Sequence, residues 1–321
     1  MSRRRPSEEY EPSPRELLDG LVVGSPRGGE YPVGAAGEIT LCRLRKRLMT
    51  AGVDRLQYLA TGDRVRFFRS PEEPERGRID EVLPRTSELS RGRPGKPPQL
   101  IVVNLDQVLI VAAVAEPDLS LHRLDRFLIL ADCAEIEPLI ILNKLDLDDD
   151  GTALAELAAI YEPLGYRVLG TSAETGEGLA ELQAALTGRV SAVVGVSGAG
   201  KSTLLNTLDP SFELATQEVM DIGKGRHTTT ASSLLPLACG GWVADTPGIK
   251  TVSPLPGLIP ADELAEHFGE LEPFVGACQF NNCTHRAEPG CQACAALAAG
   301  EIAASRFDSY LRLYEELRAA E

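Results

Sequence analysis

The sequence predicts a multi-domain protein with an N-terminal β-barrel, a central α/β domain built on a parallel sheet, and a small helical C-terminal domain rich in cysteine and histidine. Three observations predict this architecture. Short apolar segments separated by turns fill residues 17–85, strands and helices alternate over residues 99–254, and four of the seven cysteines fall within 17 residues near the C-terminal end. A chain of 321 residues suits two to three domains of about 100 to 150 residues each.

Composition is typical of a folded protein in a reducing compartment. Hydrophobic residues make up 43% and charged residues 25% of the chain, which excludes intrinsic disorder. No apolar run approaches 18 residues, and residues 1–5 lead into Pro6 without an apolar segment. We therefore expect a cytoplasmic monomer with neither a signal peptide nor a membrane partner.

Charge is spread unevenly along the chain. The net charge is −15, but residues 1–100 hold 19 Lys and Arg against 15 Asp and Glu, which is +4. Residues 101–321 hold 13 against 32, which is −19. A basic N-terminal part in an acidic protein indicates an anionic partner for that part.

Residues 1–16 are polar and are predicted to form a flexible arm. The strands predicted after them are 21–23, 31–33, 39–42, 65–68 and 78–82. Five short strands predict a barrel of OB type over residues 17–85, a fold that commonly binds oligonucleotides. A β-domain used only for packing or protein contact explains the pattern equally well. The densest basic cluster either contacts RNA phosphates or forms a solvated face, and consists of Arg43, Arg45, Lys46 and Arg47.

Residues 86–98 are predicted to be a linker, because three prolines and two glycines in thirteen residues interrupt a regular element. Beyond it, strands are predicted at 100–103, 108–114, 138–142, 167–169 and 192–196, and helices at 119–134, 152–164 and 178–187. This alternation predicts a parallel α/β sheet over residues 99–254. Residues 255–321 are predicted to form a helical domain whose last helix, within 301–321, has one buried face.

A phosphate-binding loop is predicted at residues 195–202. The segment reads Gly-Val-Ser-Gly-Ala-Gly-Lys-Ser, which matches GxxxxGK[ST], follows an apolar strand and precedes a helical run. Backbone N–H groups can close around phosphate oxygens there, while Lys201 reaches the β- and γ-phosphates as a catalytic group and Ser202 binds Mg²⁺. The residues predicted to bind the nucleotide here are Gly195, Val196, Ser197, Gly198, Ala199, Gly200, Lys201, Ser202 and Thr203.

A second phosphate-side motif, Asp-Thr-Pro-Gly at residues 245–248, follows the apolar residues 242–244. A carboxylate at the end of a strand can hold Mg²⁺ through water, and the glycine can move with the γ-phosphate. Alone, this tetrapeptide fits an ordinary turn equally well. Downstream of a P-loop, we interpret Asp245 as a magnesium group and Gly248 as a nucleotide contact.

Residues 143–146 read Asn-Lys-Leu-Asp and follow another apolar strand. A carboxylate accepts two N–H bonds side by side, which matches N1–H and the 2-amino group of guanine, whereas adenine has an acceptor at N1 and no 2-amino group. Asp146 is therefore predicted to select GTP, with Asn143 and Lys144 in the same site. Ser172 and Ala173, after the next strand, can supply a backbone N–H to the guanine O6.

Together these motifs resemble the five G-motifs of GTPases in a permuted order. NKxD and the Ser-Ala pair come before the P-loop, and a threonine cluster (Thr228, Thr229, Thr230) and DxPG come after it, which gives the order G4-G5-G1-G2-G3. With a barrel before and a Cys/His segment after them, residues 17–321 resemble the RsgA (YjeQ) family of ribosome-dependent GTPases. The resemblance implies a GTPase that is stimulated by the small (30S) ribosomal subunit, acts in late assembly of that subunit and binds its 16S rRNA. Mg²⁺ is expected with GTP, and we choose Thr229 as the ligand from the threonine cluster.

The residue that usually orients the attacking water is absent. The position after DxPG is Ile249, which cannot orient water, so we expect slow intrinsic hydrolysis and a water-positioning group from elsewhere. Our candidate is His227, just before the threonine cluster in a glycine-rich segment. The alternative is that His227 contacts only RNA or solvent.

Cys278, Cys283, His285 and Cys291 offer three thiolates and an imidazole within 14 residues. Four soft ligands close in sequence suit one tetrahedral, structural Zn²⁺. Their spacing also resembles that of the RsgA (YjeQ) family. Cys294 forms a C-x2-C pair with Cys291 and either replaces a ligand or is a spare thiol.

Two other functions fit parts of the pattern. A small-molecule P-loop kinase would share the phosphate loop, but Asp146 and the lack of an evident acceptor site argue against it. An RNA-binding assembly factor whose nucleotide site is a switch with negligible turnover stays open because of Ile249. Because DxPG leads directly into the C-terminal domain, nucleotide state is expected to reposition that domain as a lever.

Overall fold

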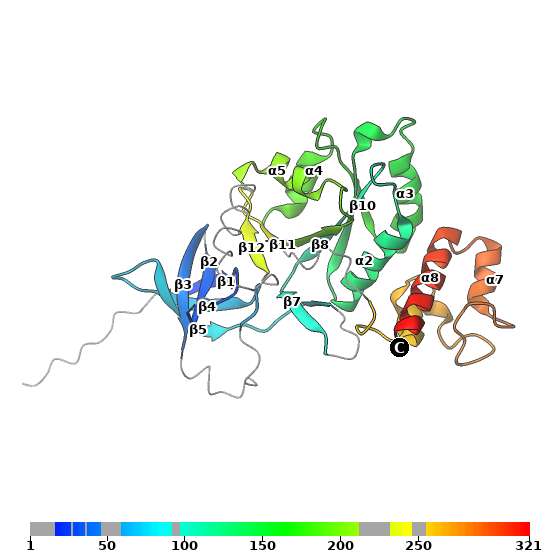
Figure 1. Ribbon diagram of the computed structural model, residues 1–321, viewed down its shortest axis with the longest axis horizontal. Coiled ribbons are helices and arrows are strands. Elements are labelled where there is room, and N and C mark those ends of the chain that lie inside the picture. The colour runs from blue at the N-terminus through cyan, green and yellow to red at the C-terminus, as the bar shows by residue number, and fades with distance from the viewer. Residues whose placement is uncertain are drawn as a thin grey trace, which may run out of the picture.

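The computed structural model describes residues 17–26, 28–35, 37–45, 59–91, 97–211, 232–245 and 255–321. Three parts follow one another across Figure 1: the barrel at one end, the α/β domain in the middle and the C-terminal domain at the other end. Their order is the one that the sequence predicts. In the part of the chain that the structure describes, no helix is both long enough and apolar enough to span a bilayer.

A closed five-stranded barrel forms the N-terminal part. Its strands are β1 (Leu18–Val22), β2 (Glu30–Ala35), β3 (Glu38–Leu44), β4 (Arg64–Arg69) and β5 (Arg76–Val82), joined in the order β1-β2-β3-β5-β4. Alternate side chains point inward, so the barrel is filled by fully buried Val22, Val33, Val65, Phe67 and Ile79. The predicted barrel is therefore confirmed.

The segment after the barrel contains a strand that the sequence analysis did not predict. β6 (Glu88–Arg91) pairs antiparallel with β7 (Gln99–Val103) and lies inside the interval 86–98. The prolines and glycines of that interval all lie at positions 92–98, so they leave residues 88–91 free to pair. The prediction of a linker without regular structure does not hold for these four residues.

A six-stranded sheet forms the α/β domain. Its strands are β8 (Gln107–Ala113), β9 (Glu137–Asn143), β10 (Arg167–Gly170), β11 (Val190–Gly195), β12 (Ser233–Pro236) and β13 (Trp242–Asp245), in the order β10-β9-β8-β11-β13-β12. Neighbouring strands are parallel except β12 with β13. The helices are α2 (Leu121–Cys133), α3 (Ala153–Tyr161), α4 (Leu179–Leu186) and α5 (Lys201–Leu208), with short 3₁₀ turns η1 (Leu145–Leu147) and η2 (Glu162–Leu164). The predicted α/β class is confirmed.

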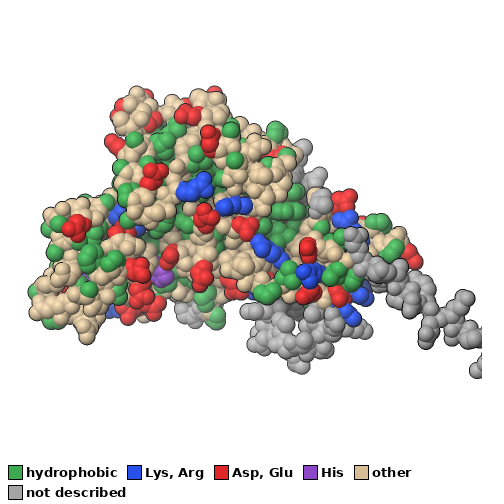
Figure 2. Space-filling view, turned by 180° about the vertical axis from the view of Figure 1, so that it is seen from behind, with side chains coloured by type: hydrophobic (Ala, Val, Ile, Leu, Met, Phe, Trp, Pro, Cys, Tyr) green, Lys and Arg blue, Asp and Glu red, His purple; other side chains and the backbone are tan. Residues whose placement is uncertain are grey.

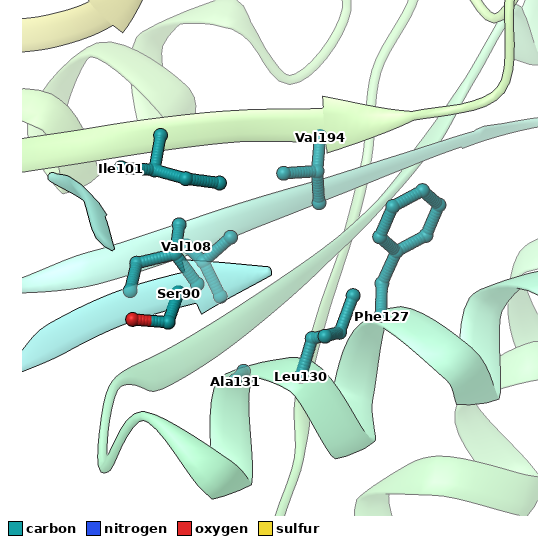
Figure 3. Close-up of a pocket in the computed structure, with 8 residues that line it drawn as sticks. Ser90, Ile101, Val108, Phe127, Leu130, Ala131 and Val194 are labelled. Atoms are coloured by element: carbon teal, nitrogen blue, oxygen red, sulfur yellow. The ribbon is translucent and has the colours of Figure 1, made fainter. Parts of the chain in front are cut away.

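Helix α2 covers the middle of this sheet. Figure 3 shows Phe127 and Leu130 reaching from α2 toward Val108 and Val194 on the strands. A cavity of about 20 Å³ remains between them and the β6–β7 hairpin, with Ser90 on its wall. A nearly apolar cavity of this size offers no set of polar partners to a ligand, so it is a gap in packing.

The C-terminal domain consists of η3 (Ala261–His267), η4 (Glu272–Phe274), α7 (Gln292–Ala299) and α8 (Ala304–Ala320). The apolar spacing of this segment predicts a buried face made of Phe307, Tyr310, Leu311, Tyr314 and Leu317. Helix α8 buries all of these except Leu311, which is half-buried. It packs against α2 of the α/β domain (Figure 1). The predicted final helix is therefore confirmed, and it begins at Ala304.

Buried hydrogen bonds join the barrel to the α/β domain. The Asn104 side-chain amide donates to the Gly62 carbonyl at 2.8 Å, and the Leu234 N–H donates to the Val23 carbonyl at 2.9 Å. Asn104 is fully buried. Because a buried polar group is costly to leave unpaired, this contact fixes the barrel relative to the sheet.

Candidate nucleotide and metal sites

The predicted nucleotide residues gather at the carboxyl ends of neighbouring parallel strands. The P-loop follows β11, the NKxD segment begins at the end of β9, and Ser172 follows β10. In sheets of this kind ligands bind outside the carboxyl ends of the strands. The fold therefore brings the predicted phosphate and base residues to one edge of the domain.

Asn143 ties the P-loop to the base side of the site. Its side-chain amide donates to the Ala199 carbonyl at 2.9 Å, and its Oδ1 accepts from the Thr171 hydroxyl at 3.1 Å. Gly200 has a φ of +87°, and a Cβ there would lie 2.3 Å from the Asn143 Nδ2. This close approach requires glycine at the position before Lys201.

Lys201 is the first residue of α5, at the mouth of the P-loop. Its Nζ donates to the Gly195 carbonyl at 2.8 Å and to the Val196 carbonyl at 2.6 Å. Ser202 and Thr203 follow it and are exposed. A cationic side chain beside a helix N-terminus makes this end of the loop suited to anionic phosphate groups.

Asp146 is oriented by a neighbouring buried hydroxyl. The Ser172 hydroxyl donates to Asp146 Oδ1 and accepts from the Thr175 N–H at 3.1 Å. Ser172 is fully buried, whereas Asp146 is exposed to an incoming base. Lys144 donates from Nζ to the Glu116 carbonyl, which holds the NKxD segment against the loop after β8.

On the magnesium side of the site, the structure describes Ser202 on α5 and the backbone of Asp245, the last residue of β13. This strand pairs with β11 through Ala192 and Ala244, so its carboxyl end lies beside the P-loop strand. The other predicted residues on this side fall outside the described residues: His227, Thr228, Thr229, Thr230, Gly248 and Ile249. Their roles stay predictions.

The four predicted metal ligands form one cluster. The ligand atoms of Cys278, Cys283, His285 and Cys291 all lie within 4.8 Å of one another. His285 Nδ1 is 3.5 Å from the sulfur atoms of both Cys278 and Cys291, which are 4.0 Å apart. Thiolates about 2.3 Å from one tetrahedral metal would lie about 3.8 Å apart, so this cluster can hold a metal ion.

The surroundings of the cluster favour metal binding. Burial lowers the pKa of His285 and so favours the neutral imidazole that a metal requires. The Cys294 N–H donates to the Cys291 sulfur at 3.4 Å. The Cys294 sulfur lies 3.6 Å from the His285 carbonyl, and Cys294 is not among the four clustered ligands.

The described part of the predicted basic cluster is paired with carboxylates. Arg43 lies 3.0 Å from Glu30, and Arg45 lies 2.6 Å from Asp80. Lys46 and Arg47 lie outside the described residues. Figure 2 shows Lys and Arg interspersed with Asp and Glu over the face that it presents, without one continuous basic surface.

Sequence reasoning missed some contacts of the site. It gave Ser172 only a backbone role and gave Glu116 none, whereas the Ser172 hydroxyl and the Glu116 carbonyl contact two NKxD residues. A signal for the first was available: because β9 and β10 are neighbours, the loops that follow them must meet.

These features define a class of protein. The P-loop and Asp146, the carboxylate predicted to bind guanine, lie at the same edge of a largely parallel sheet. Strand β9, which leads into NKxD, comes before the P-loop strand β11 in the chain. This is the arrangement of a circularly permuted P-loop GTPase.

Comparison with known proteins identifies the family. A family model described as RsgA GTPase matches residues 82–254. The small ribosomal subunit biogenesis GTPase RsgA of Moorella thermoacetica is 42% identical over 297 residues, covering 92% of this chain and 96% of that protein. Its namesake in Proteus mirabilis is 40% identical over 313 residues, covering 94% and 85%. The chain belongs to the RsgA GTPase family.

Two solved structures share the fold. YjeQ from Thermotoga maritima aligns with a TM-score of 0.73 and 35% identity, covering 94% of this chain and 99% of that chain. YloQ, described as a circularly permuted GTPase, aligns with a TM-score of 0.72 and 27% identity, covering 98% and 99%. Both likenesses extend over the barrel, the GTPase domain and the C-terminal domain together.

Proposed function

We propose that this GTPase hydrolyses GTP to GDP and phosphate during maturation of the small (30S) ribosomal subunit, and that the subunit stimulates hydrolysis. The contact between Ser172 and Asp146 carries the nucleotide part of the proposal, because it holds a carboxylate ready to accept two N–H bonds from guanine. The names of the relatives in Moorella thermoacetica and Proteus mirabilis support the ribosomal part.

The proposed catalytic groups surround the phosphates. Lys201 stabilises negative charge on the β- and γ-phosphates, and His227 positions the attacking water in place of the missing glutamine. Ser202, Thr229 and Asp245 would hold Mg²⁺, which neutralises phosphate charge. The groups proposed to bind the rest of GTP are Asn143, Lys144, Asp146, Ser172, Ala173, residues 195–203 and Gly248.

The remaining parts have supporting roles in the proposal. The cysteine and histidine cluster holds one structural Zn²⁺, because three thiolates and an imidazole leave no open position. The barrel contacts 16S rRNA, for which Arg43 and Arg45 must exchange their carboxylate partners for phosphates. The protein acts as a cytoplasmic monomer.

Phosphate release from GTP, measured for the protein alone and with isolated small subunits, tests the function. We expect a slow basal rate that rises steeply only with the subunits. Lys201→Ala supplies the background rate, and His227→Ala should lose most of the stimulated kcat while it keeps GTP binding. Intact stimulation in His227→Ala would refute the role of that histidine.

A nucleotide-gated assembly factor with negligible turnover is the second candidate, favoured by Ile249 at the position of the usual glutamine. GTP-dependent binding to the subunits without any rise in phosphate release would support it. If the subunits neither bind the protein nor stimulate phosphate release, the ribosomal role itself is contradicted.

A further inference from the structure

Helix α2 is enclosed on two sides. Its eight consecutive residues from Leu124 to Ala131 are all buried, which one packed face cannot explain. The sheet lies on one side of the helix, and α8 and η3 of the C-terminal domain lie on the other. The same helix therefore contacts both the GTPase core and the C-terminal domain.

On the sheet side, α2 reaches the start of the P-loop. Ser120, Arg123 and Leu124 line the same cavity, of about 20 Å³, as the P-loop residues Gly195 and Val196. A shift of the first turn of α2 would therefore change the space beside the phosphate-binding backbone.

On the other side, Arg306 of α8 enters a buried charged cluster. Its guanidinium donates to Asp125 Oδ1 on α2 and forms a bidentate pair with Glu270 at 2.6 and 3.0 Å. The Tyr161 hydroxyl donates to the same Asp125 oxygen at 2.6 Å. Arg306 also lies over the ring of Phe268, 4.6 Å from its centroid.

Removal of one charge from this buried cluster is expected to destabilise the protein. The Asp125 side chain is 0% exposed and that of Arg306 is 2% exposed, so removal of either charge leaves an uncompensated ion in the interior. Ser309 of α8 also hydrogen-bonds the Asp125 carboxylate. A buried cluster with one cation and two carboxylates favours a defined position for α2 over maximal stability.

We propose that Arg306 is a positioning residue for GTP turnover: its ion pair with Asp125 fixes α2 against the P-loop, so that docking of the C-terminal domain sets the geometry of the phosphate site. This route runs through α2 and is separate from the chain connection that follows DxPG.

The same two helices supply a matched control. Arg126 of α2 forms a bidentate pair with Glu316 of α8, one contact at 2.7 Å, but their side chains are 10% and 38% exposed. Arg126→Met removes a cation from the same interface, but the carboxylate that it leaves behind, Glu316, is partly exposed and can be solvated. If docking strength alone mattered, this variant would resemble Arg306→Met.

The test uses basal GTP hydrolysis by the full chain with its metal, together with GDP affinity and thermal unfolding. Asp125→Asn and Arg306→Met are expected to lower kcat on the order of tenfold, with GDP affinity and KM changed less than about twofold. Arg126→Met is expected to match the unmodified protein. The proposal is overturned if Asp125→Asn has the same kcat as Arg126→Met. It is also overturned if the fall in kcat is fully explained by weaker GDP binding and a smaller folded fraction of the variant.

A second variant and a second measurement cover the case in which a single substitution fails to fold. Asp125→Asn/Arg306→Met removes both charges and so avoids a lone buried ion. Wild-type turnover in this folded variant would overturn the proposal. In the nucleotide-bound state, hydrogen exchange of residues 195–203 should be faster in the double variant than in the unmodified protein, and equal exchange would also overturn the proposal.

The inference rests on GTP hydrolysis and not on the ribosomal role. Basal turnover requires no ribosomal subunits. Failure of subunits to stimulate the unmodified protein would therefore contradict the proposed function and leave this test unaffected.

Discussion

At the scale of single residues, base selection depends on the orientation of one carboxylate. Asp146 is exposed, lies in the 3₁₀ turn η1 and is oriented by a hydrogen bond from the Ser172 hydroxyl. Because Ser172 also accepts a backbone N–H from Thr175, its hydroxyl has a fixed direction in which to donate. Nucleotide preference should therefore follow the chemistry of the Asp146 side chain closely.

Asp146→Asn tests this directly. The amide replaces one acceptor oxygen with a donor, which opposes the guanine N–H groups and suits the C2 carbonyl of xanthine. We expect GTP affinity to fall on the order of 100-fold and xanthosine triphosphate to become the better ligand, measured by fluorescence titration with both nucleotides. Asp149→Asn, at an exposed position in the same loop, is the control. An unchanged preference for GTP would remove the guanine assignment.

His267 should make the stability of the C-terminal domain depend on pH. A hydrogen bond to Asp132 on α2, together with Cys133 beside it, raises the pKa of His267 to about 10. A raised folded-state pKa gives stability that is complete below the unfolded value of about 6.5 and is lost as pH rises toward 10.

The melting temperature should therefore decline between about pH 7 and pH 10 in the unmodified protein, and this decline should be shallower in His267→Gln. Calorimetry across that range measures the difference, which isolates His267 from other titrating groups. Parallel pH profiles for the two proteins would show that the contact contributes nothing to stability.

At the scale of elements, the segment between η4 and α7, which the structure describes throughout, has no regular helix or strand and carries the predicted metal ligands. Residues between η4 and α7 supply all four clustered ligands, and the loop ends where Cys291 caps α7. If this cluster binds the proposed metal, the order of the loop is expected to depend on it.

Removal of the metal by a chelator, or by Cys278→Ser, should unfold this domain and leave nucleotide binding in place. Hydrogen exchange of residues 278–291 should rise sharply, while the fluorescence of the single tryptophan, Trp242 on β13, should stay unchanged. Cys239→Ser changes a thiol outside the cluster and should have no such effect. Retention of one zinc per chain in Cys278→Ser would contradict the assigned ligand set.

At the scale of the whole molecule, the joint between barrel and GTPase domain is set by a turn at Gly62. Its carbonyl accepts from Asn104, its N–H donates to the Val22 carbonyl, and its φ is +96°. A Cβ at this position would lie 1.9 Å from the Val103 carbonyl oxygen. Backbone atoms would have to move apart to admit any side chain.

Gly62→Ala should therefore lower the free energy of unfolding by on the order of 3 kcal/mol and loosen the joint. Gly37→Ala is the matched control, since Gly37 also has a positive φ but a Cβ there meets nothing within 4 Å, and its cost should be about 1 kcal/mol. Denaturant unfolding compares the two variants. Equal costs would show that the backbone relieves the clash at Gly62.

The sequence predicted the elements with strong periodicity and the groups whose chemistry lies within one motif. The barrel, the α/β alternation, the P-loop context and the metal ligands could be found because neighbours along the chain encode them. Strands β6 and β12 were not predicted; β10 is equally short, but the alternation of strands and helices predicted it. The Arg306–Asp125 pair joins residues 181 positions apart, and no local pattern encodes such a contact.

The order of strands in the sheet also decides the order in which the domain can be built during translation. β8 lies between β9 and β11, and every residue of β8 is buried. β8 ends at Ala113, whereas β11 ends at Gly195, 82 residues later in the chain. At about 5 to 20 residues per second the ribosome adds that length in roughly 4 to 16 s. Throughout that interval this buried strand of the nascent sheet has at least one open edge, which is a template for wrong pairing. GTP cannot stabilise the growing domain before Ser202 has emerged, so the half that reads the base must persist without help from the ligand.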